Sequence, residues 1–308
     1  MPTALITGIS GFVGNHLSNH MLELGWRVYG FDQRARAEQQ NTFTGDITDR
    51  AAFQAALQSC RPDVLLHLAG LIKASSPQEL YSANFLATVN LFESLLASGQ
   101  RPVVLIASSS AVYGSGFGGR PISEKFRPRP ITHYGVSKLA QEVAALRYVD
   151  AADLPVMILR MFNLLGPGQS TDLACSAFAR QIARQEGCQD GEILTGNLSA
   201  RRDFVDVRDA VRAFALVAEK GKPGQIYNVC SGRAVSIRQC LNALLSMSRR
   251  PFQVRVEASR LQKNDIPVQI GNAGKLMRLT AWRPQISLKQ SLADLLAYWR
   301  QRVKLEME

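Results

Sequence analysis

The sequence predicts an α/β protein built on a doubly wound parallel sheet of the Rossmann type, followed by a smaller C-terminal α/β lobe. Two observations predict this fold. Apolar strands alternate with helical patterns from the first residues onward, and a glycine-rich turn joins the first strand to the first helix. The 308 residues are enough for one large domain or for two unequal lobes. We place the sheet domain at residues 1–162 and the lobe mainly at 163–308, with some of its segments returning to the sheet.

The first forty residues have the pattern of a β-α-β unit. An apolar strand at 4–7 runs into a turn with glycines three residues apart, and an apolar helical stripe follows. Such glycines allow a tight turn, a close approach of the backbone to a pyrophosphate, and close packing of helix on strand. The helix N-terminus then offers free N–H groups to the phosphates. Residues 1–162 are therefore predicted to bind a dinucleotide, with contacts from Gly8, Gly11, Phe12, Val13 and Gly14.

An acidic residue closes the second strand, which we expect at 27–31. Asp32 stands 18 residues after the last glycine of the turn, where a carboxylate accepts hydrogen bonds from the adenosine ribose and repels a 2′-phosphate. Arg34 and Arg36 stand close by and could instead pair with such a phosphate, or lie in a solvated loop. We expect Asp32, Gln33 and Arg34 to contact the cofactor. The cofactor is predicted to be NAD(H) or NADP(H), with NAD(H) slightly favoured.

The alternation continues through a strand at 42–44, a helix at 51–57, a strand at 63–68, a helix at 77–98 and a strand at 103–107. In such a sheet the carboxyl ends of the strands face one ligand cleft. A histidine inside the apolar run 63–68, His67, is expected to be a core residue rather than a catalyst. Further cofactor contacts are expected from Asp46, Ile47, Leu68, Ala69, Gly70, Asn84 and Met161.

Serine residues follow the strand at 103–107, and a Tyr-x-x-x-Lys pair follows on a helix. Residues four apart project from the same face of a helix, so Tyr134 and Lys138 are expected side by side. A lysine ammonium beside a phenol favours the phenolate, which predicts a lowered pKa for Tyr134 and a group that exchanges protons near neutral pH. The same spacing also occurs on solvated helix faces. Because a hydroxyl at the strand end lies at the same sheet edge as the glycine-rich turn, the catalytic interpretation is favoured.

Composition excludes several classes of function. Hydrophobic residues make up 46% of the chain, yet no apolar run approaches the roughly 18 residues of a membrane helix. The net charge is +11, but the basic residues are dispersed without interleaved aromatics, so an anionic small substrate is favoured over nucleic acid. Five cysteines form no CxxC or Cys/His pattern. We therefore expect no metal site, no disulfide framework and a cytoplasmic location.

Three motifs together resemble the extended short-chain dehydrogenase/reductases that act on nucleotide sugars. They are Gly8-x-x-Gly11-x-x-Gly14, the Ser-Ser-x-x-Val-Tyr-Gly run ending at 114, and Tyr134-x-x-x-Lys138. The resemblance covers nearly the whole chain, including the segments 160–168, 202–209, 227–232 and 271–292. It implies a Rossmann fold, a catalytic Tyr134, and a Lys138 that also holds the nicotinamide ribose. It also implies a catalytic hydroxyl at Ser109, by the position of this residue before Val-Tyr-Gly.

The resemblance leaves several reactions open. A 4,6-dehydratase would need acids next to the catalytic hydroxyl, where this chain has Ser110 and Ala111. A C4 epimerase uses the same three catalytic residues but commonly has His or Tyr where Asp206 stands. The segment 202–207 looks instead like the GDP-6-deoxy-4-keto-mannose reductases. That resemblance implies reduction of GDP-4-keto-6-deoxy-D-mannose to GDP-D-rhamnose. The alternatives are a nucleotide-sugar C4 epimerase and a non-catalytic NAD(P)-binding sensor or scaffold.

The second half of the chain is expected to bind the substrate. Asn163 is assigned to the sugar or its phosphates, and Arg202 to the diphosphate because its planar fork suits phosphate oxygens. No short motif identifies the nucleotide base, although the resemblance favours GDP. It also implies a homodimer through the helices that carry Asn84 and Tyr134. Arg180 and Arg184, four residues apart, share a helix face that could meet the nucleotide or be solvated. The full set of expected substrate contacts is Ser109, Ser110, Asn163, Arg180, Arg184, Arg202, Arg260 and Lys263.

Overall fold

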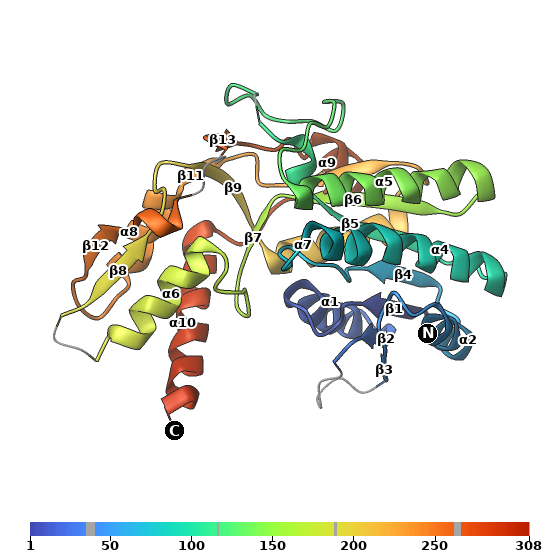
Figure 1. Ribbon diagram of the computed structural model, residues 1–308, viewed down its shortest axis with the longest axis horizontal. Coiled ribbons are helices and arrows are strands. Elements are labelled where there is room, and N and C mark those ends of the chain that lie inside the picture. The colour runs from blue at the N-terminus through green and yellow to red at the C-terminus, as the bar shows by residue number, and fades with distance from the viewer. Residues whose placement is uncertain (35–40, 116, 188–189, 262–265, 308) are drawn as a thin grey trace.

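The computed structural model describes residues 1–34, 41–115, 117–187, 190–261 and 266–307 (Figure 1). Its centre is a seven-stranded sheet in the order β10-β6-β5-β4-β1-β2-β3, in which every pair of neighbours is parallel. The doubly wound sheet predicted from the alternating pattern is therefore confirmed. The strands are β1 (Thr3–Thr7), β2 (Arg27–Asp32), β3 (Thr42–Thr44), β4 (Val64–His67), β5 (Val103–Ser109), β6 (Val156–Met161) and β10 (Ile226–Val229).

Two layers of helices cover the sheet, each with its own apolar core. One face packs against α1 (Phe12–Glu23), α7 (Val207–Lys220) and α9 (Gly274–Thr280), through side chains such as Leu17 and Phe214. The other face packs against α2 (Arg50–Cys60), α4 (Ala87–Ser98) and α5 (His133–Ala152). Because both faces are covered, β1 and β4 are buried along their whole length, which explains their continuous apolar sequences.

The segment expected as one helix over 77–98 contains a wider turn. It divides into α3 (Pro77–Tyr81), a π-helical turn η1 (Ser82–Leu86) and α4. Asn84 lies in this turn with a fully buried side chain, which hydrogen-bonds groups outside the helix. Such turns often occur where a helix contributes to a functional site. A 3₁₀ turn, η2 (Ser110–Tyr113), follows β5 directly.

The remaining elements of the second half of the chain form a lobe beside the sheet, whereas α7, β10 and α9 belong to the sheet and its helix layer (Figure 1). Strand β9 (Arg201–Asp206) pairs with β7 (Asn163–Leu165), β11 (Ala234–Ser236) and β13 (Val268–Gln269). Strands β8 (Glu192–Thr195) and β12 (Gln253–Val256) form a separate pair, and η3 (Ala258–Arg260) follows. Helices α6 (Ala174–Gln185), α8 (Ile237–Ser246) and α10 (Leu288–Met307) enclose a third apolar core.

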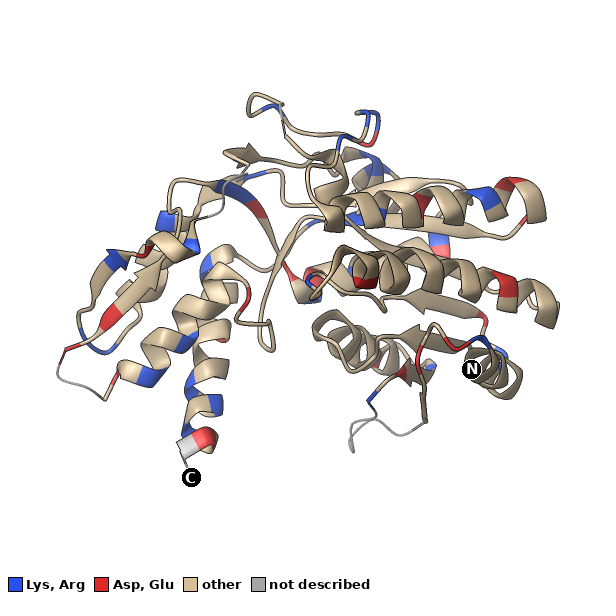
Figure 2. Cartoon of the chain, in the orientation of Figure 1, with Lys and Arg blue, Asp and Glu red and all other residues tan. Residues whose placement is uncertain are grey.

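Most of the excess positive charge belongs to the second half of the chain. Residues 163–308 contain 22 Lys and Arg against 13 Asp and Glu, or +9 of the total of +11. Figure 2 shows these basic residues spread over several elements rather than gathered on one of them. Among the described residues, no helix is long and apolar enough to cross a membrane, and no three His, Cys, Asp or Glu side chains are grouped to hold a metal ion.

Candidate active site

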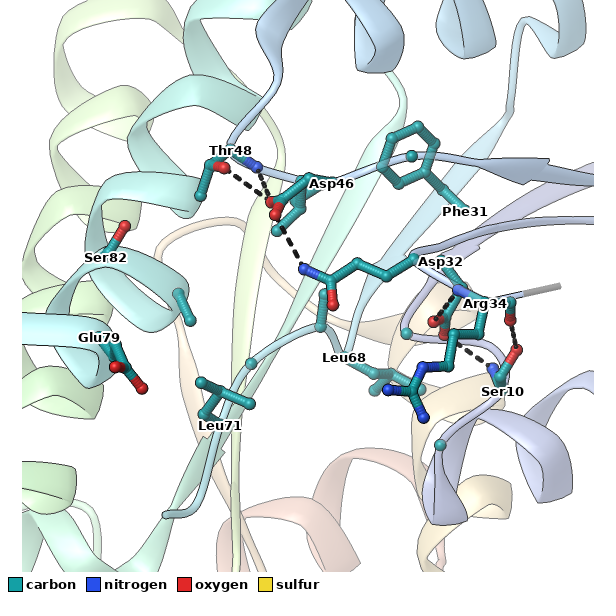
Figure 3. A pocket seen from close by; sticks show the side chains of 18 residues that line it. Ser10, Phe31, Asp32, Arg34, Asp46, Thr48, Leu68, Leu71, Glu79 and Ser82 are labelled. Carbon is teal, nitrogen blue, oxygen red and sulfur yellow. Dashed lines mark hydrogen bonds between the residues drawn. The ribbon is translucent and has the colours of Figure 1, made fainter. Parts of the chain in front are cut away.

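A cavity of about 840 Å³ lies at the carboxyl ends of β1, β2 and β4. This is where the strand order reverses between β1 and β4, the place where doubly wound sheets bind their ligands. Its volume falls within the range of about 300–1,000 Å³ that is usual for small-molecule sites. The residues that line it are Gly8, Ser10, Gly11, Phe31, Asp32, Gln33, Arg34, Gly45, Asp46, Ile47, Thr48, Leu68, Ala69, Gly70, Leu71, Glu79, Ser82 and Ala83 (Figure 3).

The glycine-rich turn leaves no room for side chains. Gly8 has a φ of +72°, and a Cβ atom there would lie 2.8 Å from the backbone nitrogen of Ala69. A Cβ atom on Gly14 would lie 2.1 Å from the carbonyl oxygen of Gly8, so only glycine lets α1 pack this closely on the turn. Helix α1 starts after Gly11 without a side-chain cap. Its first N–H groups are thus suited to the pyrophosphate of a dinucleotide.

Asp32 ties the turn to the segment after β2. Its carboxylate accepts hydrogen bonds from the backbone N–H of Ser10 at 3.0 Å and of Arg34 at 3.2 Å (Figure 3). The Ser10 hydroxyl donates to the carbonyl of Arg34 at 2.7 Å. This arrangement places the carboxylate and the Arg34 side chain at the same end of the cavity, where an adenosine ribose would lie.

Asp46 forms the neighbouring wall of the cavity. It accepts hydrogen bonds from the backbone N–H and the hydroxyl of Thr48, and from the Gln33 amide at 2.8 Å. The Thr48 bonds hold the pKa of Asp46 below its ordinary value, so the carboxylate is ionised at neutral pH. Two loops that are distant in the sequence thus meet beside the expected adenosine position.

Ten of the expected cofactor residues line this cavity: Gly8, Gly11, Asp32, Gln33, Arg34, Asp46, Ile47, Leu68, Ala69 and Gly70. Ser10, Thr48, Leu71, Glu79 and Ser82 line it as well, although the sequence did not single them out. Ser10 lies within the glycine motif and Thr48 lies two residues after Asp46, so both stand next to residues that the sequence predicted to contact the cofactor. No sequence pattern predicted a cofactor contact for Glu79 or Ser82, because they belong to an ordinary polar helix segment.

A second group of polar side chains lies at the end of β5. Ser109 precedes η2, and its hydroxyl accepts the backbone N–H of Ala111 at 3.2 Å. The Ser109 side chain also lies near the phenol of Tyr134, at the start of α5, and favours its ionised form. Burial raises the pKa of Tyr134, and Ser109 opposes that change only in part. The predicted lowering of this pKa is therefore wrong for the protein chain alone.

Lys138 explains the difference, because its ammonium is directed elsewhere. Its Nζ donates to the carbonyl oxygen of Ala107 at 2.8 Å and to the side-chain oxygen of Gln141 at 2.9 Å. Burial lowers the pKa of Lys138 to about 8, even though Glu142 opposes the change. A Cβ atom on Gly70 would lie 3.6 Å from this Nζ, so the ammonium stands at the edge of the cofactor cavity.

Two of the residues expected to contact a ligand make internal hydrogen bonds in the structure. Asn84 is fully buried, and its amide bonds Leu71 N and O and the Ser137 hydroxyl, at 2.8–2.9 Å. It thus holds the loop after β4 against α5 and does not reach the cavity. Ser110 is also buried, and its hydroxyl donates to Gln269 at 3.1 Å rather than facing a substrate. Phe12, Val13, Gly14 and Met161 are not among the residues that line the cofactor cavity.

A second cavity, of about 570 Å³, is formed almost entirely by the lobe. Asn163, Arg202 and Arg260 line it together, although the sequence separates them by almost one hundred residues. Lys73, from the loop after β4, also lines it and forms an ion pair of 2.8 Å with Asp172 of the lobe. The structure therefore brings three of the expected substrate residues to one cavity.

Arg180 and Arg184 do not line that cavity. Both form ion pairs with Glu306 of α10, at 3.3 and 2.9 Å, and Arg180 also stacks on the ring of Trp299. Their expected contact with the nucleotide is thus not supported, because α10 covers the helix face that carries them. Lys263 and Arg36 lie outside the residues that the structure describes.

Asp206 has a structural role. It caps the N-terminus of α7 by accepting the backbone N–H of Arg208, and it pairs with the Arg208 guanidinium at 2.8 Å. The Ser291 hydroxyl of α10 also donates to it. The residue used to separate the reductase pattern from the epimerase pattern therefore lines neither cavity.

The comparisons with known proteins agree with this architecture. The family model described as "NAD dependent epimerase/dehydratase family" matches residues 4–230. The GDP-6-deoxy-D-mannose reductase of Pseudomonas aeruginosa is 32% identical, over 98% of each protein. The GDP-6-deoxy-D-talose 4-dehydrogenase of Aggregatibacter actinomycetemcomitans is 28% identical, over 89% of this chain and 90% of its own length. A solved structure, RMD from Pseudomonas aeruginosa complexed with NADPH, superposes with a TM-score of 0.88 at 30% identity, covering 98% of this chain and 100% of that one.

Proposed function

This chain belongs to the NAD dependent epimerase/dehydratase family, and we propose that it reduces the C4 ketone of a nucleotide-linked 4-keto-6-deoxyhexose with NAD(P)H. The substrate that fits best is GDP-4-keto-6-deoxy-D-mannose, which would give GDP-D-rhamnose; the similarity to a GDP-6-deoxy-D-mannose reductase over 98% of the chain supports this choice. The proximity of Ser109 to Tyr134, one helix turn from Lys138, supports proton transfer in a reductase and in an epimerase alike, and the 32% identity to a GDP-6-deoxy-D-mannose reductase favours the reductase.

In the proposed reaction Ser109 and Tyr134 hold the carbonyl oxygen at C4 of the sugar. The bound nicotinamide supplies the hydride. Tyr134 then gives its proton to the new alkoxide, and the Ser109 hydroxyl stabilises the phenolate that remains. Since burial raises the pKa of Tyr134, the phenol carries its proton at neutral pH, which suits a donor. Lys138 would hold the ribose hydroxyls of the bound cofactor and compensate the phenolate charge.

The cavity beside Asp32 supports binding of either cofactor. Asp32 stands where a carboxylate accepts the ribose hydroxyls of NAD(H), whereas the neighbouring Arg34 offers a cation for a 2′-phosphate. Both carboxylate oxygens already accept backbone N–H groups, which reduces their repulsion of a phosphate. We expect both cofactors to be used, with NAD(H) slightly favoured. Ratios of kcat/KM for NADH and NADPH measure this preference.

The substrate is assigned to the second cavity. Arg202 would bind the diphosphate, Asn163 the sugar or its phosphates, and Arg260 would close over the same group. Arg202 is already oriented, because its guanidinium donates to the carbonyl oxygens of Arg201 and Ile266. Residues 1–162 would thus bind the cofactor, and residues 163–308 would mainly bind the nucleotide sugar.

The decisive assay follows oxidation of NADPH and NADH with GDP-, dTDP- and UDP-linked 4-keto-6-deoxy sugars, with the product identified by NMR. Oxidation with the GDP substrate and a rhamnose product is the expected result. Conversion of a nucleotide sugar at C4 without net change in the cofactor would identify a C4 epimerase instead. Tight cofactor binding without turnover of any sugar would identify a sensor or scaffold.

A homodimer through α4 and α5 is also proposed. Val143 of α5 is 63% exposed, and Leu86 and Val136 nearby are also exposed apolar residues. Light scattering should give twice the chain mass, and Val143→Glu should give a monomer. No nucleic-acid or membrane partner is proposed. The four described cysteines are free thiols, which supports a reducing compartment such as the cytoplasm.

A further inference from the structure

A row of buried polar side chains runs behind Lys138. It consists of Thr7 on β1, His67 on β4, Thr88 on α4, Gln141 on α5 and Lys138 itself, and we call it the polar row. The first four side chains are fully buried and Lys138 is 6% exposed. The successive contacts are 2.7 Å from Thr7 to His67, 3.0 Å from His67 to Thr88, 2.8 Å from Thr88 to Gln141 and 2.9 Å from Gln141 to Lys138.

The direction of every hydrogen bond in the polar row follows from one carbonyl group. The Thr88 hydroxyl lies 2.8 Å from the backbone carbonyl oxygen of Asn84, which can only accept, so Thr88 donates its proton there. The Thr88 oxygen must then accept from the Gln141 amide and from Nε2 of His67. His67 is therefore the Nε2–H tautomer, and its Nδ1 accepts the hydroxyl proton of Thr7.

This assignment gives every group in the middle of the row a defined partner. The Thr7 oxygen also accepts the N–H of Ala69 at 3.2 Å, and the side-chain oxygen of Gln141 faces Lys138. A protonated His67 would present a donor to the Thr7 hydroxyl and remove the acceptor that the hydroxyl now uses. Burial keeps the pKa of His67 at about 3, so the imidazole stays neutral, as its place in the row requires.

We propose that His67, acting through Thr88 and Gln141, is a positioning residue for Lys138. The inference rests on the proposed function, because it concerns how Lys138 is presented to the cofactor and to Tyr134. Two of the three N–H donors of the ammonium are held by Gln141 and Ala107, which leaves one directed away from them. The polar row thus fixes which N–H of the Lys138 ammonium remains for the cofactor ribose and for the Tyr134 phenolate.

The same row also fixes the cavity edge that faces Lys138. Thr7 holds the N–H of Ala69. Asn84, whose carbonyl receives the Thr88 hydroxyl, holds both backbone groups of Leu71. Gly70 lies between these two anchored residues and next to the Lys138 ammonium. His67 therefore couples the position of the loop after β4 to the orientation of the lysine on α5.

A matched pair of hydroxyl deletions on α4 tests the proposal. Thr88→Val keeps the side-chain shape but removes the oxygen that serves His67 and Gln141. Ser94→Ala is the control, because Ser94 is equally buried on α4 and bonds the carbonyl four residues back at 2.7 Å, yet lies outside the row. We expect kcat to fall about tenfold in Thr88→Val, with little change in KM for the sugar and no change in Ser94→Ala.

The titration of Lys138 provides a readout that does not depend on turnover. With ¹³C-labelled lysine, NMR should show a lower pKa for Lys138 in Thr88→Val, because a freed Gln141 no longer accepts from the ammonium. The alkaline limb of the kcat profile should move to lower pH for the same reason. His67→Gln retains a donor toward Thr88 and should keep more activity than His67→Leu.

Equal effects of Thr88→Val and Ser94→Ala, or an unchanged Lys138 titration in His67→Leu, would overturn the positioning role. If Thr88→Val does not fold, Gln141→Leu interrupts the polar row between Thr88 and Lys138 and allows the same titration of Lys138. Failure of the wild-type protein to reduce any 4-keto sugar would instead refute the proposed function. The lysine titration would still decide the role of the row in that case.

Discussion

The two cavities of this protein are built in different ways. The cofactor cavity depends on backbone geometry: glycines at 8, 11 and 14, the N-terminus of α1 and the ends of parallel strands. The substrate cavity depends on side chains from three separate segments, at 163–178, 194–204 and 259–261, together with Ile237 of α8 and Lys73 of the other domain. A cavity made by backbone leaves a local signature in the sequence, because only certain residues allow the required turns. A cavity made by distant side chains leaves none.

The arginines of the lobe show what this difference means. Arg202 was predicted to bind the diphosphate because its planar fork suits phosphate oxygens, and Arg184 to meet the nucleotide because it shares a helix face with Arg180. One lines the cavity and the other pairs with Glu306 on the outside of the lobe. What separates them is the packing of α10 against α6, which is a tertiary contact that no local pattern encodes.

The largest effect is expected where the cofactor cavity meets the catalytic group. Tyr134→Phe removes the proposed proton donor while keeping the ring, so hydride transfer should slow by a factor of about one hundred or more. Cofactor affinity should change little, because the cavity is formed by other residues. Single-turnover absorbance at 340 nm measures the first quantity and fluorescence titration the second. A variant with full activity would remove Tyr134 from the mechanism.

Two glycines with left-handed backbones offer the next test of the backbone-built cavity. Gly8 and Gly25 have φ values of +72° and +80°, so alanine costs about 1–2 kcal/mol of strain at either one. Only at Gly8 would the new Cβ meet backbone atoms, those of Leu68 and Ala69. We expect the cofactor Kd of Gly8→Ala to rise about thirtyfold and that of Gly25→Ala to stay unchanged. Equal changes in Kd would mean that the turn has no special role in binding.

The sequence predicted the sheet and the part of the site that the sheet positions. Strand ends and glycines follow from the alternating pattern, so the pattern alone assigned Asp32, Asp46 and Gly70 to the cofactor, and all three line the cavity. A hydroxyl near Tyr134 was also predicted from the shared sheet edge, whereas the choice of Ser109 rested on the family resemblance.

Side-chain direction within an element was not predictable. The π turn at 82–86 directs the Asn84 side chain into the interior. No sequence pattern in that segment predicts such a turn. Ser110 points to Gln269, a partner 159 residues away. The pKa of Tyr134 had the opposite direction from that predicted, because the spacing of a Tyr–Lys pair says nothing about the acceptors that capture the ammonium.

The two arginines of the lobe provide a third test. Arg202→Met should raise KM for the nucleotide sugar about tenfold, because a charge-assisted bond to the diphosphate is lost. Arg184→Met removes the same charge but only a half-exposed ion pair, so kcat/KM should stay within about twofold of the wild type. Thermal unfolding of both variants controls for damage to the lobe. A similar rise in KM for both would show that net charge, rather than the lining of the cavity, governs substrate binding.

The smallest effect is expected at Asp206, which stabilises the lobe without lining either cavity. Burial alone would raise its pKa, but hydrogen bonds from Arg208 and Ser291 outweigh burial and hold the pKa below its ordinary value. A lowered carboxyl pKa stabilises the fold above the unfolded pKa of about 3.9, and this contribution is lost as the pH falls through the folded value.

Asp206→Asn should therefore lower the free energy of unfolding by about 1–2 kcal/mol at pH 7, and by less below pH of about 4. Asparagine still caps α7, and Arg208 keeps its ion pair of 2.6 Å with Asp294, so the loss stays moderate. Urea unfolding at both pH values measures the difference, and kcat/KM should be unchanged. A change in the reaction product would show instead that this residue, which distinguishes the reductase pattern from the epimerase pattern, acts on the chemistry through the packing of α7 and α10.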